Sequence, residues 1–253
     1  MSTALIGPSN PTSVVAFGAG KQIQTHLLLH LQHYPSIRTC TVVTRSASSP
    51  NVHELKAVLE PRFDSIEFKY ITYSPSLASE EDAEDLVKKS LLDASIIVCA
   101  TSSTRPLFPS SWVRAGTHVI LVGSFKPEMR EVDKELVLRA VSDFASESCY
   151  QEGSRGMLLV DSRAACQIEA GDIISAGVGV DGMVEIGKLC SDRASMGTHY
   201  VSKMEFQGER TIRGPITLFK SVGLGIQDVA IACAVVKRAE EMGIGTYIKN
   251  YDV

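Results

Sequence analysis

A stretch near the start of the chain, from Ser13 to Leu31, has the pattern of a turn that binds a dinucleotide. An apolar run is followed by Gly-Ala-Gly and then by a helical pattern. In such a turn the first glycine allows a tight bend, and the second lets a pyrophosphate approach the N–H groups of the helix N-terminus. A plain strand-to-helix turn is the alternative interpretation. The residues predicted to contact the cofactor here are Gly18, Ala19, Gly20, Lys21 and Gln22.

The end of the next apolar run indicates which dinucleotide is bound. A site selective for NAD(H) places Asp or Glu there to hold the ribose 2′-hydroxyl. Here the run ends in Thr44, Arg45 and Ser46, and the first acidic residue is Glu54. A guanidinium pairs with a phosphate through two hydrogen bonds, so we predict NADP(H) in preference to NAD(H). An arginine in a solvated loop is the alternative interpretation.

Two later turns carry small and hydroxyl-bearing residues directly after apolar runs. In "CATSSTRPLF" the hydroxyls of Thr101 and Ser102 are predicted to bond ribose or phosphate. In "ILVGSFKPEMREVD" the predicted contacts are Val122, Gly123 and Ser124, with the nicotinamide lying against the backbone. Parallel strands bring such turns to one edge of a sheet, where ligands bind.

The last apolar run offers a further contact and the candidate catalytic group. Ser221 is predicted to contact the cofactor, and Lys220 faces either the nicotinamide or solvent. Asp228 is the candidate catalytic residue, with an exposed helix carboxylate as the alternative interpretation. The six cysteines and six histidines show no metal-ligand spacing, so no metal site is predicted.

Alternating strands and helices must position these residues. The predicted strands are 14–17, 39–44, 66–71, 95–100, 118–122 and 157–160, and the predicted helices are 21–33, 52–60, 82–92 and 131–140. Apolar runs without polar alternation are typical of strands buried on both faces. The order predicts an α/β fold with a doubly wound parallel sheet of Rossmann type.

Three parts of the chain are predicted. Residues 1–12 form a flexible lead-in, and residues 13–215 form the dinucleotide-binding domain, with a surface insertion at 142–156. Residues 216–253 form a C-terminal strand and helix. The net charge of −4 provides no basic field for a nucleic acid. Because we find neither a signal peptide nor an apolar run of about 20 residues, we expect a soluble, cytoplasmic protein without a membrane partner.

The segments as a set resemble the ornithine cyclodeaminase/mu-crystallin family. In chain order they are "GAGKQ", "TR", "ATSSTRPLF", "WVRAGTHVILVGSFKPEMREVDKELVLRA", "VDSRAACQIEAGDI" and "TLFKSVGLGIQDVAIACAVVKRAEEMGIGT". The resemblance implies a Rossmann domain that binds NAD(H) or NADP(H). It also implies an oxidoreductase acting on carbon–nitrogen bonds of small imino or amino acids, here an NADPH-dependent ketimine reductase.

Two departures from the family pattern matter. Phe125 stands where the ornithine cyclodeaminases carry an aspartate, so ornithine cyclisation is not expected. Family members also carry an N-terminal substrate and dimerisation domain, whereas 12 residues precede Ser13 here. We therefore expect a chain without that domain, with its C-terminal segment as a remnant. Either the chain self-associates as a homodimer, or the chain is a truncated product. A non-catalytic protein that binds NADPH or a small ligand is the alternative function.

Overall fold

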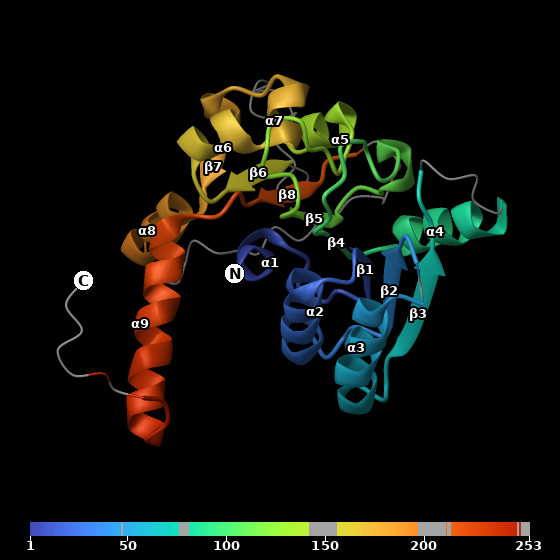
Figure 1. The fold of residues 1–253 in the computed structure, drawn as a ribbon. Coiled ribbons are helices and arrows are strands. Elements are labelled where there is room, and N and C mark those ends of the chain that lie inside the picture. Colours follow the sequence, from blue (N-terminus) through green and yellow to red (C-terminus); the bar gives the residue numbers. More distant parts are fainter. Residues whose placement is uncertain are drawn as a thin grey trace. The chain divides into compact units, whose positions relative to one another are not determined.

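The computed structural model describes residues 1–46, 48–75, 81–141, 156–196, 211, 214–246 and 248. The chain divides into two compact units, Met1–Val222 and Gly223–Val253. In the described residues, the first unit is a sheet with helices and the second contains one long helix (Figure 1).

A parallel sheet forms the centre of the first unit. Its strand order is β3-β2-β1-β4-β5-β8-β6-β7, and every described pair of neighbours is parallel. The strands are β1 (Ser13–Phe17), β2 (Thr39–Thr44), β3 (Glu67–Thr72), β4 (Ile96–Cys99), β5 (His118–Leu121), β6 (Met157–Val160), β7 (Val184–Glu185) and β8 (Thr217–Lys220). The predicted doubly wound α/β fold is confirmed, and the strand order reverses between β1 and β4.

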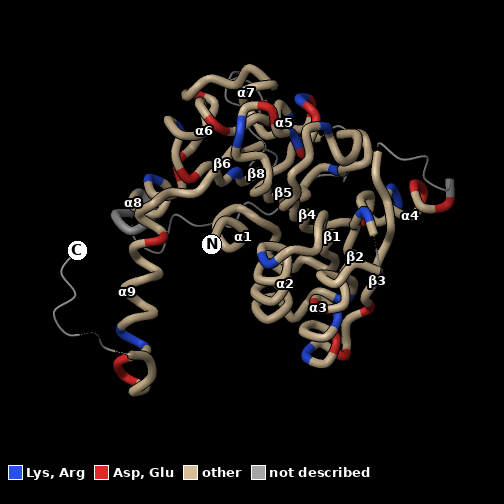
Figure 2. Tube along the Cα trace, in the orientation of Figure 1, with Lys and Arg blue, Asp and Glu red and all other residues tan. Residues whose placement is uncertain are grey.

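Helices cover both faces of this sheet. The α-helices of the first unit are α1 (Ser2–Ile6), α2 (Lys21–His33), α3 (Pro50–Leu59), α4 (Glu81–Asp93), α5 (Lys134–Arg139), α6 (Arg163–Glu169), α7 (Gly171–Ala176) and α8 (Ile186–Met196). Short 3₁₀ helices are η1 (Glu60–Arg62), η2 (Ser110–Trp112) and η3 (Val180–Gly182). Figure 2 shows acidic and basic residues interspersed along this unit.

Two apolar cores lie on opposite faces of the sheet. Successive strand residues point to opposite faces, so Val14 and Ala16 of β1 join one core while Val15 and Phe17 join the other. The first of these cores contains side chains of α2 and α3, and the second contains side chains of α4 and α5. Burial on both faces explains why central strands such as β1 and β4 lack polar alternation, whereas the edge strand β3 carries the exposed Glu67 and Lys69.

The N-terminal residues differ from the expected flexible lead-in. Residues 2–6 form α1, and Ile6 is 1% exposed. The hydroxyl of Thr3 lies 2.8 Å from Nε2 of His30, and that of Ser2 lies 3.4 Å from Nε2 of His118. Apolar burial and these hydrogen bonds order a segment that is too short to show a helical period.

The boundary near the C-terminus also differs from the expected one at residue 216. Because β8 pairs with both β5 and β6, it belongs to the sheet of the first unit, and the units divide after Val222. Of the expected insertion at 142–156, all but Gly156 lies outside the described residues.

The second unit contains helix α9 (Gly225–Met242). The helix ends at Gly243, which adopts the left-handed conformation with a φ of +64° and donates a hydrogen bond to the carbonyl of Glu240. Among the described residues, no helix is both long and apolar enough to span a bilayer.

Candidate functional site

The glycine turn after β1 has a backbone that only glycine tolerates at its first position. Gly18 has a φ of +107°, and a Cβ atom there would lie 2.9 Å from the carbonyl oxygen of Ala100. Its N–H donates to the carbonyl of Val43 at 2.9 Å. Gly20 differs, because a Cβ there would meet nothing within 4 Å. The backbone is therefore tightly packed at Gly18 and open at Gly20.

Helix α2 begins directly at this open position. Gly20 is its N-cap residue, and no side chain caps the helix. The ammonium of Lys21 pairs with the carboxylate of Glu54 in α3, and both side chains are exposed, so the pair contributes little to stability. Gln22 is exposed as well.

The predicted selectivity residues lie at the carboxyl end of β2. Arg45 and Ser46 are exposed, and Thr44 is half-buried. The Ser46 N–H donates to the hydroxyl of Thr44 at 3.4 Å, which shapes the turn. Among the side chains that the structure describes, no carboxylate forms an ion pair with Arg45.

A buried carboxylate connects the turns after β4 and β5. Glu131 is 0% exposed. One of its oxygens accepts from the Thr101 N–H at 2.6 Å and from the Thr101 hydroxyl at 2.9 Å, and the other accepts from the Gly123 N–H at 2.8 Å. The two turns are so close that a Cβ on Gly123 would lie 2.0 Å from the Thr101 carbonyl oxygen. The Thr101 hydroxyl, a predicted ribose or phosphate contact, thus donates its hydrogen bond to Glu131.

A second buried carboxylate, that of Asp172, contacts the residues around Glu131 and Ser124. Asp172, at the start of α7, accepts from the N–H groups of Glu131 and Val132 at 2.8 and 3.1 Å. Its second oxygen accepts a hydrogen bond from the hydroxyl of Ser124. That hydroxyl in turn accepts from Nζ of Lys220 at 2.7 Å. The Ser124 side chain points into the protein.

Burial disfavours the charged forms of two of these side chains, Glu131 and Lys220. Burial raises the pKa of Glu131, while the N–H of Thr101 and the ammonium of Lys220 act in the opposite direction. Burial also lowers the pKa of Lys220, while the carboxylates of Asp172 and Glu131 oppose that change. Lys220 is 0% exposed, which excludes the expected alternative that it faces solvent. The opposite charges and hydrogen bonds make the burial of these groups tolerable.

Asp161 orders the segment after β8. It accepts from the Ser221 hydroxyl at 2.8 Å and from the Val222 N–H at 2.9 Å. The Ser221 hydroxyl, a predicted cofactor contact, therefore donates a hydrogen bond within the protein, and the residue is half-buried.

The fold places the predicted cofactor residues along one edge of the sheet. They lie at or just after the carboxyl ends of β2, β1, β4, β5 and β8, which are consecutive neighbours. Val122 is half-buried there, and Ser102 and Phe125 are exposed. Asp228, the candidate catalytic residue, is exposed on α9 in the second unit.

Sequence reasoning missed the cluster beneath this edge. The sequence predicts no site role for Glu131, Asp172 or Asp161, and it does not decide whether Lys220 faces the nicotinamide or solvent. The available signal was that Lys220 closes the apolar run "TLFK", where an unpaired charge would be costly. The carboxylate partners come from distant segments, so only the fold identifies them.

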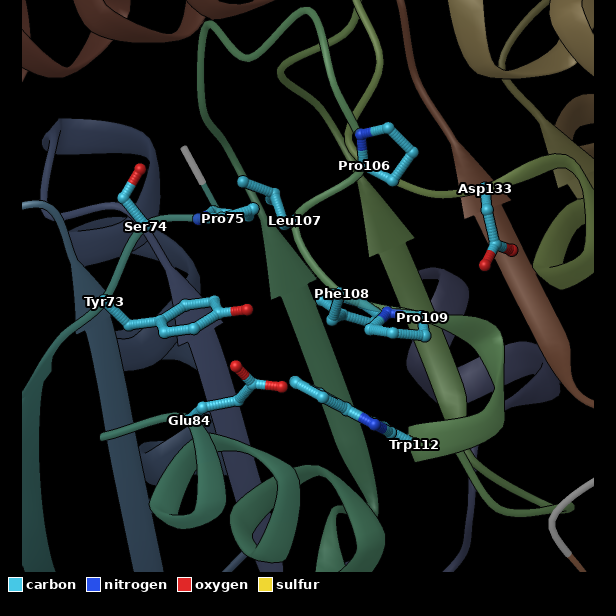
Figure 3. A pocket seen from close by; sticks show the side chains of 10 residues that line it. All are labelled: Tyr73, Ser74, Pro75, Glu84, Pro106, Leu107, Phe108, Pro109, Trp112 and Asp133. Carbon is cyan, nitrogen blue, oxygen red and sulfur yellow. The ribbon is translucent and has the colours of Figure 1, made fainter. Parts of the chain in front are cut away.

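A pocket of about 630 Å³ lies elsewhere in the first unit (Figure 3). Its walls come from residues after β3, from α4, from residues after β4 and from Asp133, and they include the rings of Tyr73, Phe108 and Trp112. Figure 3 shows the Tyr73 hydroxyl and the Glu84 carboxylate directed into it. None of the predicted cofactor residues lines it. The described residues contain no cluster of three or more His, Cys, Asp or Glu that could hold a metal ion.

The parallel sheet, its reversed strand order and the glycine turn define an α/β protein with a Rossmann-type fold. The sequence profile of the ornithine cyclodeaminase/mu-crystallin family matches residues 76–243. The chain belongs to this family.

Comparison with individual proteins gives the extent of the similarity. An uncharacterized cyclodeaminase of Dictyostelium discoideum is 27% identical over 100% of this chain and 65% of its own length. The ketimine reductase mu-crystallin of Rattus norvegicus is 29% identical over 58% of this chain and 36% of its own length. Among solved structures, the Delta(1)-pyrroline-2-carboxylate reductase of Thermococcus litoralis, in complex with NADH and L-proline, matches 98% of this chain and 64% of its own. That match has a TM-score of 0.70 and 24% identity. The chain thus spans less than two thirds of the length of these relatives.

Proposed function

We propose that the edge formed by the carboxyl ends of β2, β1, β4, β5 and β8 binds a nicotinamide dinucleotide. The observation that carries this proposal is the pair of turns that Glu131 joins, beside the glycine turn and at the reversal of strand order. Doubly wound sheets bind ligands in this crevice. The names of the relatives support it, since one is a ketimine reductase and another is a reductase in complex with NADH.

The pyrophosphate is proposed to bind at the N-terminus of α2. Gly20 leaves open space in front of its backbone, and no side chain caps the helix. The first N–H groups of a helix carry partial positive charge and lack partners within the helix. A diphosphate fits both features, because it needs close approach to the backbone and anion-binding groups.

Arg45 is proposed to select NADP(H) over NAD(H). Its guanidinium is exposed at the end of β2, where an NAD-selective site would carry an acid. Glu54, the nearest acid along the sequence, pairs with Lys21 instead. A 2′-phosphate on the adenosine ribose would therefore meet a cation and the exposed Ser46.

We propose reduction of the C=N bond of a small imino acid as the reaction. A bound reduced nicotinamide supplies a hydride. The imine carbon would accept the hydride and the imine nitrogen would take up a proton from water, so that the imino acid becomes an amino acid and the cofactor is left oxidised. The role proposed for Gly123 and Ser124, which are themselves buried, is to hold the accessible Val122 and Phe125 on either side of them as a fixed surface for the nicotinamide ring. The hydrogen bonds that these two buried residues make to Glu131, Asp172 and Lys220 prevent that surface from shifting.

A non-catalytic cofactor-binding protein is the second candidate. The observation that favours it is the burial of the charged groups beneath the edge: Glu131, Asp172 and Lys220 are each 0% exposed. None of these three meets a substrate at the surface, and Phe125 supplies no proton-transfer group.

Titration of NADPH and NADH into the wild type and Arg45→Ala tests the cofactor proposal. We expect the wild type to prefer NADPH, and Arg45→Ala to lose about 10- to 100-fold in NADPH affinity with little change for NADH. Equal wild-type affinities would contradict the proposed preference. Oxidation of NADPH in the presence of a cyclic imino acid would then favour the reductase over the binding protein.

A further inference from the structure

We propose that Lys220, Ser124 and Asp172 form a positioning unit for the nicotinamide half of the cofactor. This inference rests on the proposed function, because it assigns a role within that same edge. In this unit Lys220 is a positioning residue that acts through Ser124.

The three side chains form a continuous chain of hydrogen bonds. Nζ of Lys220 donates to the Ser124 hydroxyl at 2.7 Å, and this hydroxyl donates to a carboxylate oxygen of Asp172. Each residue is 0% exposed. The three come from three separate segments: the end of β8, the turn after β5 and the start of α7. The unit therefore ties the turn after β5 to two other parts of the first unit.

The location of the unit restricts it to one end of the site. Lys220 pairs in register with Leu121 at the end of β5, so it lies directly beside the strand that leads into Gly123 and Ser124. The glycine turn and Arg45 follow β1 and β2, which stand on the far side of β4 from β5. A change in the unit should therefore reach the nicotinamide surface without reaching the pyrophosphate and adenosine contacts.

Burying a charged lysine costs free energy, and this cost supports a specific role for Lys220. Burial lowers the pKa of Lys220, and Asp172 and Glu131 oppose that shift. A buried ion pair is often no more stabilising than apolar residues of similar volume. Lys220 and Asp172 instead fix the direction of the Ser124 hydroxyl, which lies between them, since Lys220 only donates and Asp172 accepts.

The test compares two ligands that differ only in the nicotinamide. NADPH and 2′-phospho-ADP-ribose are titrated calorimetrically into the wild type, Ser124→Ala, Lys220→Met and Lys220→Arg. We expect Ser124→Ala and Lys220→Met to weaken NADPH binding about tenfold, while 2′-phospho-ADP-ribose binding changes less than about twofold. Lys220→Arg retains a donor and a charge, so it should recover part of the NADPH affinity.

Ser13→Ala is the matched control. Ser13 is also a buried serine whose hydroxyl makes hydrogen bonds, to the Asp93 carbonyl and the Ser95 N–H, but it lies at the amino end of β1. It should leave the ratio of the two affinities unchanged. A general loss of structure would weaken the binding of both ligands together, and we do not expect that result.

The outcomes separate this inference from the proposed function. A wild type that binds neither ligand contradicts the proposed function itself. A wild type that binds both, with variants that lose both affinities equally or lose neither, overturns the positioning role. Ser124→Ala keeps both charges and removes one hydroxyl, so it remains decisive if Lys220→Met does not fold. Failure of Ser124→Ala to fold would also overturn the inference, because the unit would then serve the core.

Discussion

At the scale of single residues, the candidate site depends on Glu131. Its carboxylate accepts hydrogen bonds from the turns that follow β4 and β5. The Thr101 and Gly123 backbones meet there so closely that no side chain fits at position 123. Two glycines of the candidate site differ in what surrounds them. Gly123 is required by packing, whereas Gly20 faces open space.

Matched alanine substitutions separate these two roles. Gly123→Ala should destabilise the protein by about 2–3 kcal/mol, because its Cβ would overlap the Thr101 carbonyl. Gly20→Ala should change stability by no more than about 1 kcal/mol but reduce NADPH affinity at least about tenfold. Urea unfolding and calorimetry measure the two effects. A stable Gly123→Ala, or a Gly20→Ala that binds normally, would contradict the assignment.

Buried histidines predict how stability depends on pH. Burial, with a contribution from His30, lowers the pKa of His118 to about 3, and burial lowers that of His26 to about 4. The unfolded chain protonates histidine near pH 6.5, so between these values it binds more protons than the folded protein. The contribution of these two histidines to stability is therefore full above about pH 6.5 and decreases as the pH falls toward 3.

Urea unfolding at several pH values tests the histidine contribution. His118→Gln should flatten the loss of stability between about pH 6.5 and 4. The exposed Gln32 on the same helix provides the control, since Gln32→Ala removes no imidazole and should leave the slope unchanged. An identical slope in His118→Gln and the wild type would exclude His118 as its source.

At the scale of elements, α1 shows how a short segment becomes ordered by its contacts. Ile6 is buried, and Thr3 and Ser2 bond the imidazoles of His30 and His118. A five-residue helix is too short to be stable by itself. Its order comes from the rest of the first unit.

Truncation of Ile6 measures how much α1 contributes. Ile6→Ala should lower the free energy of unfolding by about 2–4 kcal/mol, because it leaves a cavity in the core. Ile226→Ala is the control, since Ile226 is 74% exposed on α9. The two unfolding curves should differ clearly, and equal stabilities would show that α1 does not contribute to the core.

The long elements were predictable from sequence, and the reason is physical. Strands β1 and β2 and helix α2 carry uninterrupted apolar or periodic patterns, and their observed bounds match the predicted ones within a residue. By contrast, α1 has too few residues for a period. The cluster of Glu131, Asp172 and Lys220 depends on contacts between segments 40 to 96 residues apart, which no local pattern encodes.

At the scale of the whole molecule, the first unit contains every predicted cofactor residue, and the second contributes α9. The family profile covers residues 76–243 and so extends across both units. The glycine turn lies before that range, yet its geometry agrees with its predicted role, with a positive φ at Gly18 and open space at Gly20. Two independent observations, the family membership and the edge geometry, thus lead to the same proposal.

Calorimetric titration of NADPH into the wild-type chain tests the central claim most directly. We expect saturable binding with one molecule of cofactor per chain, and a rise in the unfolding midpoint when NADPH is present. Absence of saturable binding by a chain that unfolds cooperatively would contradict the claim that this edge is a dinucleotide site.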